Sequence, residues 1–291
     1  MQITIFTPSY NRAYLLPRLY ESLLIQDNKN FEWIIVDDGS SDNTKEVVNG
    51  FIQEGKINIT FETQQNSGKH IAINRGVELA KGELFFIVDS DDYLTIDALQ
   101  VISDKYTVEI SEDPSIAGIC GRKGYSETKP IGSEHFSEDF LVSSLDFRYK
   151  LNMKGDMAEV IKTNVIREFP FPVIEGEKFC TEGLIWSRVA EHHKFLFFSK
   201  IIYIAEYLEG GLSDSIVKVR IKSPNYAILF YSELEKMKIP LLQKIKANIN
   251  FWRFAKYTKL SFSQKLRKVN LLNSVLGIPI SVIFSFKDPK I

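Results

Sequence analysis

Short apolar runs alternate with helical repeats along the first hundred residues. Four runs are continuous enough to form buried strands, and between them apolar residues recur at the spacing of an amphipathic helix. We predict strands at residues 3–7, 31–36, 57–61 and 84–88, and helices at residues 12–26, 43–53 and 68–79. Alternation with short connections predicts an α/β fold, with a mostly parallel central sheet flanked by helices.

The pattern is looser in the rest of the chain. We predict helices at 96–106 and 181–192, strands at 115–121 and 195–205, and irregular loops at 122–155 and 168–178. The end of the chain has mainly helical periodicity. These expectations divide the chain into one α/β domain with two halves and a helical C-terminal region, at residues 1–110, 111–215 and 216–291.

Polar side chains follow three of the predicted strands. The segment 7–11 follows the first strand, Asp37 and Asp38 follow the second, and the segment 89–92 follows the fourth. In sheets of this kind, ligands bind beyond the carboxyl ends of the strands. We therefore expect these segments to converge on a single binding site at one edge of the sheet.

Two carboxylates in the last of these segments suit a metal site. Asp89 and Asp91 stand two residues apart in a loop, and such a pair can hold a divalent cation that in turn binds a diphosphate. The alternative is a loop in which a polar side chain, Asp92 or Thr95, caps the next helix. The segment alone leaves both interpretations open.

The other two polar segments are equally ambiguous by themselves. Asp38 can accept the imide N–H of a uracil ring, although an acid before a helix is also an ordinary cap. Gly68 opens the third helix beside Lys69 and His70, where the positive helix end can meet a base or a phosphate. A solvent-exposed helix start explains Lys69 and His70 equally well.

Together, these motifs occur in the order and spacing of family 2 glycosyltransferases, which the chain resembles over roughly residues 1–100. The resemblance rests on Thr7-Pro8-Ser9-Tyr10-Asn11-Arg12, Val36-Asp37-Asp38-Gly39-Ser40, Asn66-Ser67-Gly68, Asn74-Arg75-Gly76, Gly82 and Asp89-Ser90-Asp91-Asp92. It implies the GT-A fold, a nucleoside-diphosphate sugar donor that we expect to carry UDP, a divalent cation (Mn²⁺ or Mg²⁺), and inversion at the anomeric carbon.

The resemblance also implies roles for individual residues. Asp91 corresponds to the metal ligand of the DXD motif, and Asp89 to its first acid, near the ribose and the metal. The donor contacts implied by position are Thr7, Pro8, Tyr10, Asp38, Asn66, Lys69, Asn74, Asp89 and Ser90.

An inverting transfer needs a general base for the acceptor hydroxyl. In the family this base usually lies in an acidic pair four residues before a Trp. Aligned on Trp186, Glu182 falls on the base position, while Thr181 replaces the usual first acid. We predict Glu182 as the base and Asp156 as an acceptor contact; the alternative for Glu182 is that it caps its helix.

The net charge of -1 conceals a strong asymmetry. From residue 216 onward, 15 Lys and Arg face three acids, a balance of +12, whereas the remainder carries 21 against 34, a balance of -13. The tail also contains aromatic residues and an apolar stretch at 271–286 that is shorter than the ~20 residues of a membrane span. We expect either peripheral contact with an anionic membrane or a helical region packed on the catalytic core with its lysines in solvent.

Composition bears on the cellular location of the protein and on its partners. The two cysteines, Cys120 and Cys180, have no metal-ligand spacing, and no signal peptide is apparent. We therefore expect a reducing, cytoplasmic location, either free or at the inner face of the plasma membrane. The tail has no recognisable nucleic-acid-binding module, so we expect no nucleic-acid partner.

We therefore predict transfer of a sugar to a hydroxyl of a glycan or lipid-linked glycan in surface polysaccharide biosynthesis. One rival is a sugar nucleotidyltransferase, which usually has a glycine-rich loop after its first strand; residues 7–11 contain no glycine. The other rival is a non-catalytic binding protein.

Overall fold

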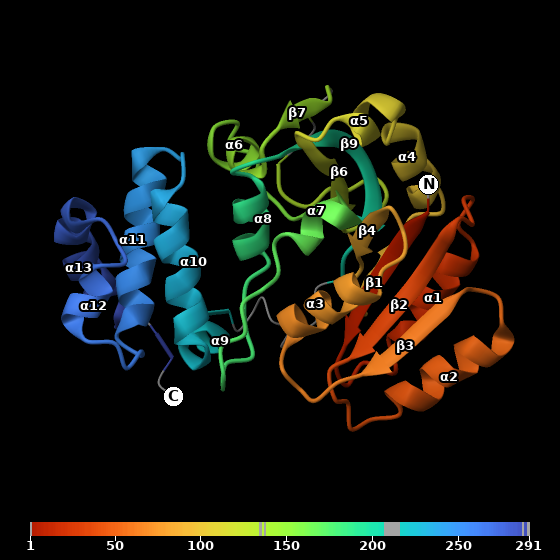
Figure 1. Ribbon diagram of the computed structural model, residues 1–291, viewed down its shortest axis with the longest axis horizontal. Coiled ribbons are helices and arrows are strands. Elements are labelled where there is room, and N and C mark those ends of the chain that lie inside the picture. The colour runs from red at the N-terminus through yellow and green to blue at the C-terminus, as the bar shows by residue number, and fades with distance from the viewer. Residues whose placement is uncertain (1, 134–135, 137, 207–215, 287, 290–291) are drawn as a thin grey trace.

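The computed structural model describes residues 2–133, 136, 138–206, 216–286 and 288–289. A nine-stranded sheet forms its centre, in the order β3-β2-β1-β4-β8-β6-β9-β5, with β7 paired to β9. Helices cover the two faces of the sheet, and a group of C-terminal helices extends the molecule along its long axis (Figure 1).

The first half of the sheet is parallel, as predicted. Its strands are β1 (Ile3–Ser9), β2 (Phe31–Asp37), β3 (Ile59–Thr63) and β4 (Leu84–Ile87), with Ile3 of β1 aligned between Phe31 and Leu84. The connecting helices are α1 (Leu16–Leu24), α2 (Thr44–Glu54) and α3 (Lys69–Leu79). The first strand continues two residues past its predicted end, and the first helix is shorter than predicted.

The second half of the sheet is mixed, so the predicted parallel pairing is concentrated in the first half. Of the eight strand pairings among the described residues, four are antiparallel, and three of these involve β8 or the short β5. The strands of this half are β5 (Tyr93–Leu94), β6 (Ile116–Gly124), β7 (Phe140–Val142), β8 (Met157–Lys162) and β9 (Lys194–Ile204). The strand β8 was missed: it inserts between β4 and β6 and reverses the chain direction there.

Two apolar cores lie on opposite faces of the sheet. One is built around α1, α2 and α4 (Ala98–Lys105), next to the short α5 (Val108–Glu112). The other is built around α3, α7 (Thr163–Arg167) and α8 (Gly183–Val189), with α6 (Ser144–Tyr149) at its edge. The helix predicted at 181–192 is therefore present but shorter, and the loop at 168–178 has no helix or strand, as predicted.

The C-terminal region is helical, as predicted. Its helices are α9 (Ile216–Lys222), α10 (Pro224–Lys236), α11 (Leu241–Ala255), α12 (Phe262–Leu266) and α13 (Leu271–Ser285). They enclose a third apolar core, with α11 packed between α10 and α13. No described helix combines the length and the apolar character needed to cross a membrane.

The helix α10 anchors this region to the α/β part. The Tyr226 side chain is 2% exposed, and its hydroxyl donates to the Pro172 carbonyl at 2.7 Å and accepts from the Ile174 N–H at 2.9 Å. His70 Nε2 lies 2.8 Å from the same oxygen, and Arg188 forms two 2.8 Å contacts with Glu233. Of the two arrangements that the sequence left open, packing of the helical region on the catalytic core therefore holds for α10.

Candidate functional site

A cavity of about 520 Å³ lies beyond the carboxyl ends of β1, β2 and β4. It brings together most of the site residues predicted from the sequence, although they come from segments far apart in the chain. The predicted residues that line it are Pro8, Tyr10, Asp38, Asn66, Lys69, Asp89, Ser90, Asp91 and Asp156.

One wall of the cavity is held in place by Asp38. This buried carboxylate accepts hydrogen bonds from the N–H groups of Ser67 and Gly68 at 2.7 and 2.8 Å, and from the Gln64 amide at 2.8 Å. Gly68 has φ +98°, and a Cβ there would overlap the carbonyl oxygen of Lys178. Only glycine fits this point, where the loop after β3 turns into α3.

Three carboxylates gather at the end of β4. Oxygens of Asp89, Asp91 and Asp92 all lie within 4.8 Å of one another. Burial and the neighbouring Asp89 raise the pKa of Asp91, and they raise the pKa of Asp92 to about 7. This concentration of hard oxygen ligands fits Mn²⁺ or Mg²⁺.

The side chain of Asp92 already accepts hydrogen bonds from other parts of the protein. Asp92 accepts hydrogen bonds from the Tyr203 hydroxyl at 2.5 Å and from the Glu206 N–H at 2.9 Å. The same Tyr203 oxygen accepts the N–H of Asp89 at 3.0 Å. Asp92 therefore shapes the loop, so we take Asp91, with Asp89 beside it, as the candidate metal ligand.

Lys69 links this acidic loop to the predicted base. Its Nζ lies 2.6 Å from Asp89 Oδ1 and 2.7 Å from Glu182 Oε1, so a single ammonium bridges the two carboxylates. Burial alone would lower the pKa of Lys69, but Asp89 and Glu182 outweigh it and hold that pKa well above its usual range. Lys69 is therefore a permanent cation between the two parts of the site.

Glu182 occupies the first position before α8. Its side chain makes no capping hydrogen bond, so the alternative of a simple helix cap is not observed. Glu182 does not itself line the cavity; it reaches the cavity through Lys69. Asp156 is exposed and lines the cavity directly, and the preceding Gly155 carbonyl accepts a hydrogen bond from Arg148 at 3.0 Å.

Two predicted donor contacts lie elsewhere. Thr7 is fully buried, and its hydroxyl accepts the indole N–H of Trp33 at 2.9 Å, so its side chain faces the core and not the cavity. Asn74 lies on another face of α3 from Lys69 and forms hydrogen bonds of 2.8 and 2.9 Å with the Phe171 backbone. Both side chains form hydrogen bonds within the fold and do not line the cavity.

The sequence interpretation missed residues that come from the second half of the sheet. Lys123 lines the cavity, and its ammonium lies 4.0 Å from the centre of the Tyr203 ring. Burial opposes its charge, but Asp89 and Asp92 outweigh burial and raise the pKa of Lys123. The one signal in the sequence is a charged residue near the end of an apolar strand, which does not reveal its neighbours.

A mixed sheet covered by helices, with an acidic cavity at the carboxyl ends of its parallel strands, is the arrangement of GT-A glycosyltransferases. Residues 4–142 match the family described as Glycosyl transferase family 2. Together with the relatives described next, this match over just under half of the chain supports a family 2 glycosyltransferase, an enzyme with the GT-A fold.

Two relatives match most of the chain. "Glycosyltransferase GlyG" of Streptococcus pneumoniae is 28% identical over 234 residues, which cover 74% of this chain and 73% of the relative. "GalNAc(5)-diNAcBac-PP-undecaprenol beta-1,3-glucosyltransferase" of Campylobacter jejuni is 26% identical over 239 residues, covering 81% and 74%. These relatives favour glycosyl transfer over the two rival classes, a nucleotidyltransferase and a non-catalytic binding protein.

Solved structures support the fold. TarS of S. aureus in complex with UDP-GlcNAc has a TM-score of 0.64 and 21% identity, and the match covers 99% of this chain and 82% of that one. The GT-A fold implied by the motif resemblance is therefore confirmed.

Proposed function

We propose that this protein is an inverting glycosyltransferase that moves a sugar from a nucleoside-diphosphate donor, UDP in our assignment, to a hydroxyl of a glycan or lipid-linked glycan in surface polysaccharide biosynthesis. The observation that carries this proposal is the Lys69 ammonium, which joins the first acid of the DXD motif to the predicted base. The undecaprenol-linked acceptor named for the Campylobacter relative supports the acceptor class.

The donor occupies the cavity beyond β1 and β2. Asp38, Asn66 and Pro8 line this cavity, which can enclose a nucleoside base. The Tyr10 ring is 50% exposed at the same cavity, so its face is accessible for stacking on a base. The uracil assignment rests on Asp38, whose oxygens retain lone pairs beside the three hydrogen bonds that they accept.

Asp91, assisted by Asp89, would hold the divalent cation. Bound there, Mn²⁺ or Mg²⁺ would neutralise the charge that develops on the leaving diphosphate. Lys69 and Lys123 face the same acids and contribute positive charge to this end of the cavity. We propose that both lysines assist in holding the diphosphate.

Glu182 acts as the general base. The acceptor oxygen attacks the anomeric carbon on the side opposite the diphosphate, and its proton passes to the Glu182 carboxylate as the new C–O bond forms. The bond to the diphosphate oxygen breaks in the same displacement, and the nucleoside diphosphate leaves. Asp156 holds the acceptor, because its exposed carboxylate lines the cavity. We place this reaction on the cytoplasmic side of the membrane, where the acceptor lipid would be reached.

A donor screen tests the proposal. The protein is incubated with a panel of nucleotide sugars and Mn²⁺, and the released nucleotide is identified, with water replacing the acceptor. We expect release of UDP from at least one UDP-sugar, and loss of that release on addition of EDTA with recovery when Mn²⁺ is restored. Release of pyrophosphate, or equal activity with EDTA present, would contradict the proposal.

A further inference from the structure

The last long helix, α13, exposes its apolar residues and buries its small ones. Ser274, Gly277 and Ser281 face inward, and the two serines are 3% and 4% exposed. Large apolar side chains cover the outer face and its C-terminal continuation, with exposures from 46% to 85%: Leu271, Leu272, Val275, Leu276, Val282, Ile283, Phe284 and Phe286. In an ordinary surface helix the apolar face is turned inward.

The inward face is tightly packed, so this orientation is built into the fold. A Cβ on Gly277 would overlap the Asn248 side-chain oxygen on α11. The Trp252 indole donates to Ser274 Oγ at 3.0 Å, and Asn248 also donates to this oxygen, at 3.2 Å. Small residues that allow such a close approach between helices are typical of packing within membranes.

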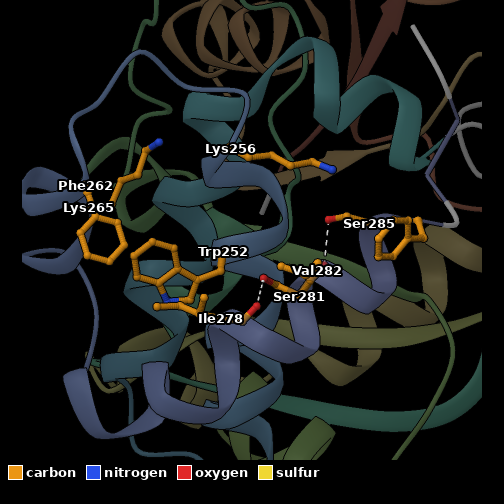
Figure 2. Close-up of a pocket in the computed structure, with 9 residues that line it drawn as sticks. Trp252, Lys256, Phe262, Lys265, Ile278, Ser281, Val282 and Ser285 are labelled. Atoms are coloured by element: carbon orange, nitrogen blue, oxygen red, sulfur yellow. Dashed lines mark hydrogen bonds between the residues drawn. The ribbon is translucent and has the colours of Figure 1, made fainter.

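The polar side chains of α13 have hydrogen-bond partners within the protein, and Asn273 donates to Glu235 Oε1 on α10 at 2.7 Å. Ser281 donates to the Ile278 carbonyl at 2.7 Å, and Ser285 donates to the Ser281 carbonyl at 2.8 Å, as Figure 2 shows. The 15 residues of α13 include no charged side chain. Its outer face can therefore leave water without burying a charged side chain.

A groove of about 480 Å³ lies beside this face, between α11, α12 and α13. Trp252, Phe262 and Val282 are among its apolar lining, and Lys256 and Lys265 also line it (Figure 2). The Trp252 and Phe262 ring centres are 5.6 Å apart. Aromatic rings beside lysines are characteristic of the interface between lipid headgroups and acyl chains.

Positive charges predominate around the groove. The segment 256–268 contains Lys256, Lys259, Lys265, Arg267 and Lys268 and no acid. The nearest acid, Asp288, has a side chain that is 2% exposed; it is paired with Arg253 and lies 3.7 Å from Lys256. The surface beside the apolar face is therefore cationic.

We propose that the outer face of α13 and the adjoining groove form a docking surface for an anionic lipid bilayer. At about 1.5 Å per residue, the 15 residues of α13 reach roughly 22 Å, short of the ~30 Å hydrocarbon core, so the helix lies in the interface. A second copy of the chain fits less well, because self-association would bring the cations of 256–268 together. The surface lies at the end of the molecule opposite β2 and β3 (Figure 1).

Vesicle co-sedimentation with the full chain tests this proposal without any substrate, so its failure is separate from failure of the proposed reaction. The probes are phosphatidylcholine vesicles and vesicles containing phosphatidylglycerol. We expect binding to the anionic vesicles that weakens with salt, and about a tenfold or greater loss of partitioning in Leu272→Ser/Val275→Ser/Ile283→Ser. Lys256→Gln/Lys265→Gln should lose about fivefold per lysine.

Matched controls use equally exposed residues elsewhere. Ile25→Ser/Val108→Ser/Val173→Ser removes three exposed apolar side chains of the α/β part, and Lys45→Gln/Lys81→Gln removes two exposed lysines. Both should bind anionic vesicles as the wild type does. Equal binding by the α13 variant and the wild type overturns the proposal. So does a wild-type dimer that the α13 variant converts to a monomer, since a second copy would then cover the face.

Discussion

At the scale of single residues, charge and burial decide which side chains reach the site. Asp38, Lys69, Asp89 and Asp91 could be predicted, because each belongs to a short motif beside a predicted strand end and the structure places all four at the cavity. Lys123 could not, because its neighbours depend on how distant strands pair. Thr7 was wrongly placed, since family position does not show which way a strand residue points.

The partly buried Glu159, close to the site, provides a prediction at this scale. Burial raises the pKa of Glu159 to about 7, although Arg148 and Lys123 oppose the shift, while Glu182 adds to it. A carboxyl whose pKa is higher in the folded state stabilises the fold below its unfolded value, and that stability is lost as the pH rises through 7.

Glu159→Gln removes this loss, because the amide is neutral at every pH. In urea titrations at pH 8 we expect the variant to be more stable than the wild type by about 2 kcal/mol in free energy of unfolding, with no gain at pH 4. The exposed Glu168→Gln serves as the control and should follow the wild type at both pH values. An equal gain from Glu159→Gln at pH 4 and pH 8 would rule out the titration of this group as the cause.

At the scale of elements, local periodicity explains what could be predicted. The strands of the first hundred residues are continuous apolar runs and the helices repeat every 3.6 residues, and their predicted positions are confirmed within a few residues. The strand β8 follows a segment whose sequence has no clear periodicity, and it pairs antiparallel with both of its neighbours. No βαβ pattern in the sequence therefore predicts it. The mixed character of the sheet follows from this one strand more than from any other.

The turn into α3 provides a prediction at the element scale. Gly68→Ala places a Cβ against the Lys178 carbonyl in a backbone conformation that disfavours side chains. We expect a loss of about 2 kcal/mol or more in free energy of unfolding, with weaker UDP binding, because the N–H groups that hold Asp38 must shift.

Gly50→Ala is the matched control for this change. Gly50 lies within α2 with open space around its Cβ position, so alanine there should stabilise the protein by about 0.5–1 kcal/mol. Chemical denaturation and UDP titration of both variants provide the comparison. A Gly68→Ala protein as stable as the wild type would show that the turn tolerates a side chain.

At the scale of the whole molecule, two arrangements join parts that the sequence presents separately. The C-terminal region divides its roles: α10 inserts Tyr226 into the α/β part, while α13 on the far side exposes an apolar face. The sequence showed the basic, aromatic character of this tail but not which helix faces inward. That depends on the close packing of Gly277 on α11, a contact that no local pattern reveals.

The second arrangement is the site itself. Its donor acids come from the parallel half of the sheet, whereas Glu182 and Asp156 come from the second half, and Lys69 ties Glu182 to the donor acids. Glu182 could be predicted only by alignment on Trp186, and its proximity to Asp89 is a property of the folded chain. We propose that the Glu182 carboxylate, and not Asp156, takes the proton of the acceptor hydroxyl.

The most direct test is the rate of Mn²⁺-dependent UDP release to water by Glu182→Gln and Asp156→Asn, measured beside the affinity of each variant for UDP with Mn²⁺. We predict that Glu182→Gln lowers kcat by 10²–10⁴-fold with UDP affinity unchanged, since water also requires the base. Asp156→Asn should keep kcat within a few-fold of the wild type, because it contacts only the missing acceptor. Full turnover by Glu182→Gln, with loss of turnover in Asp156→Asn, would contradict the assignment.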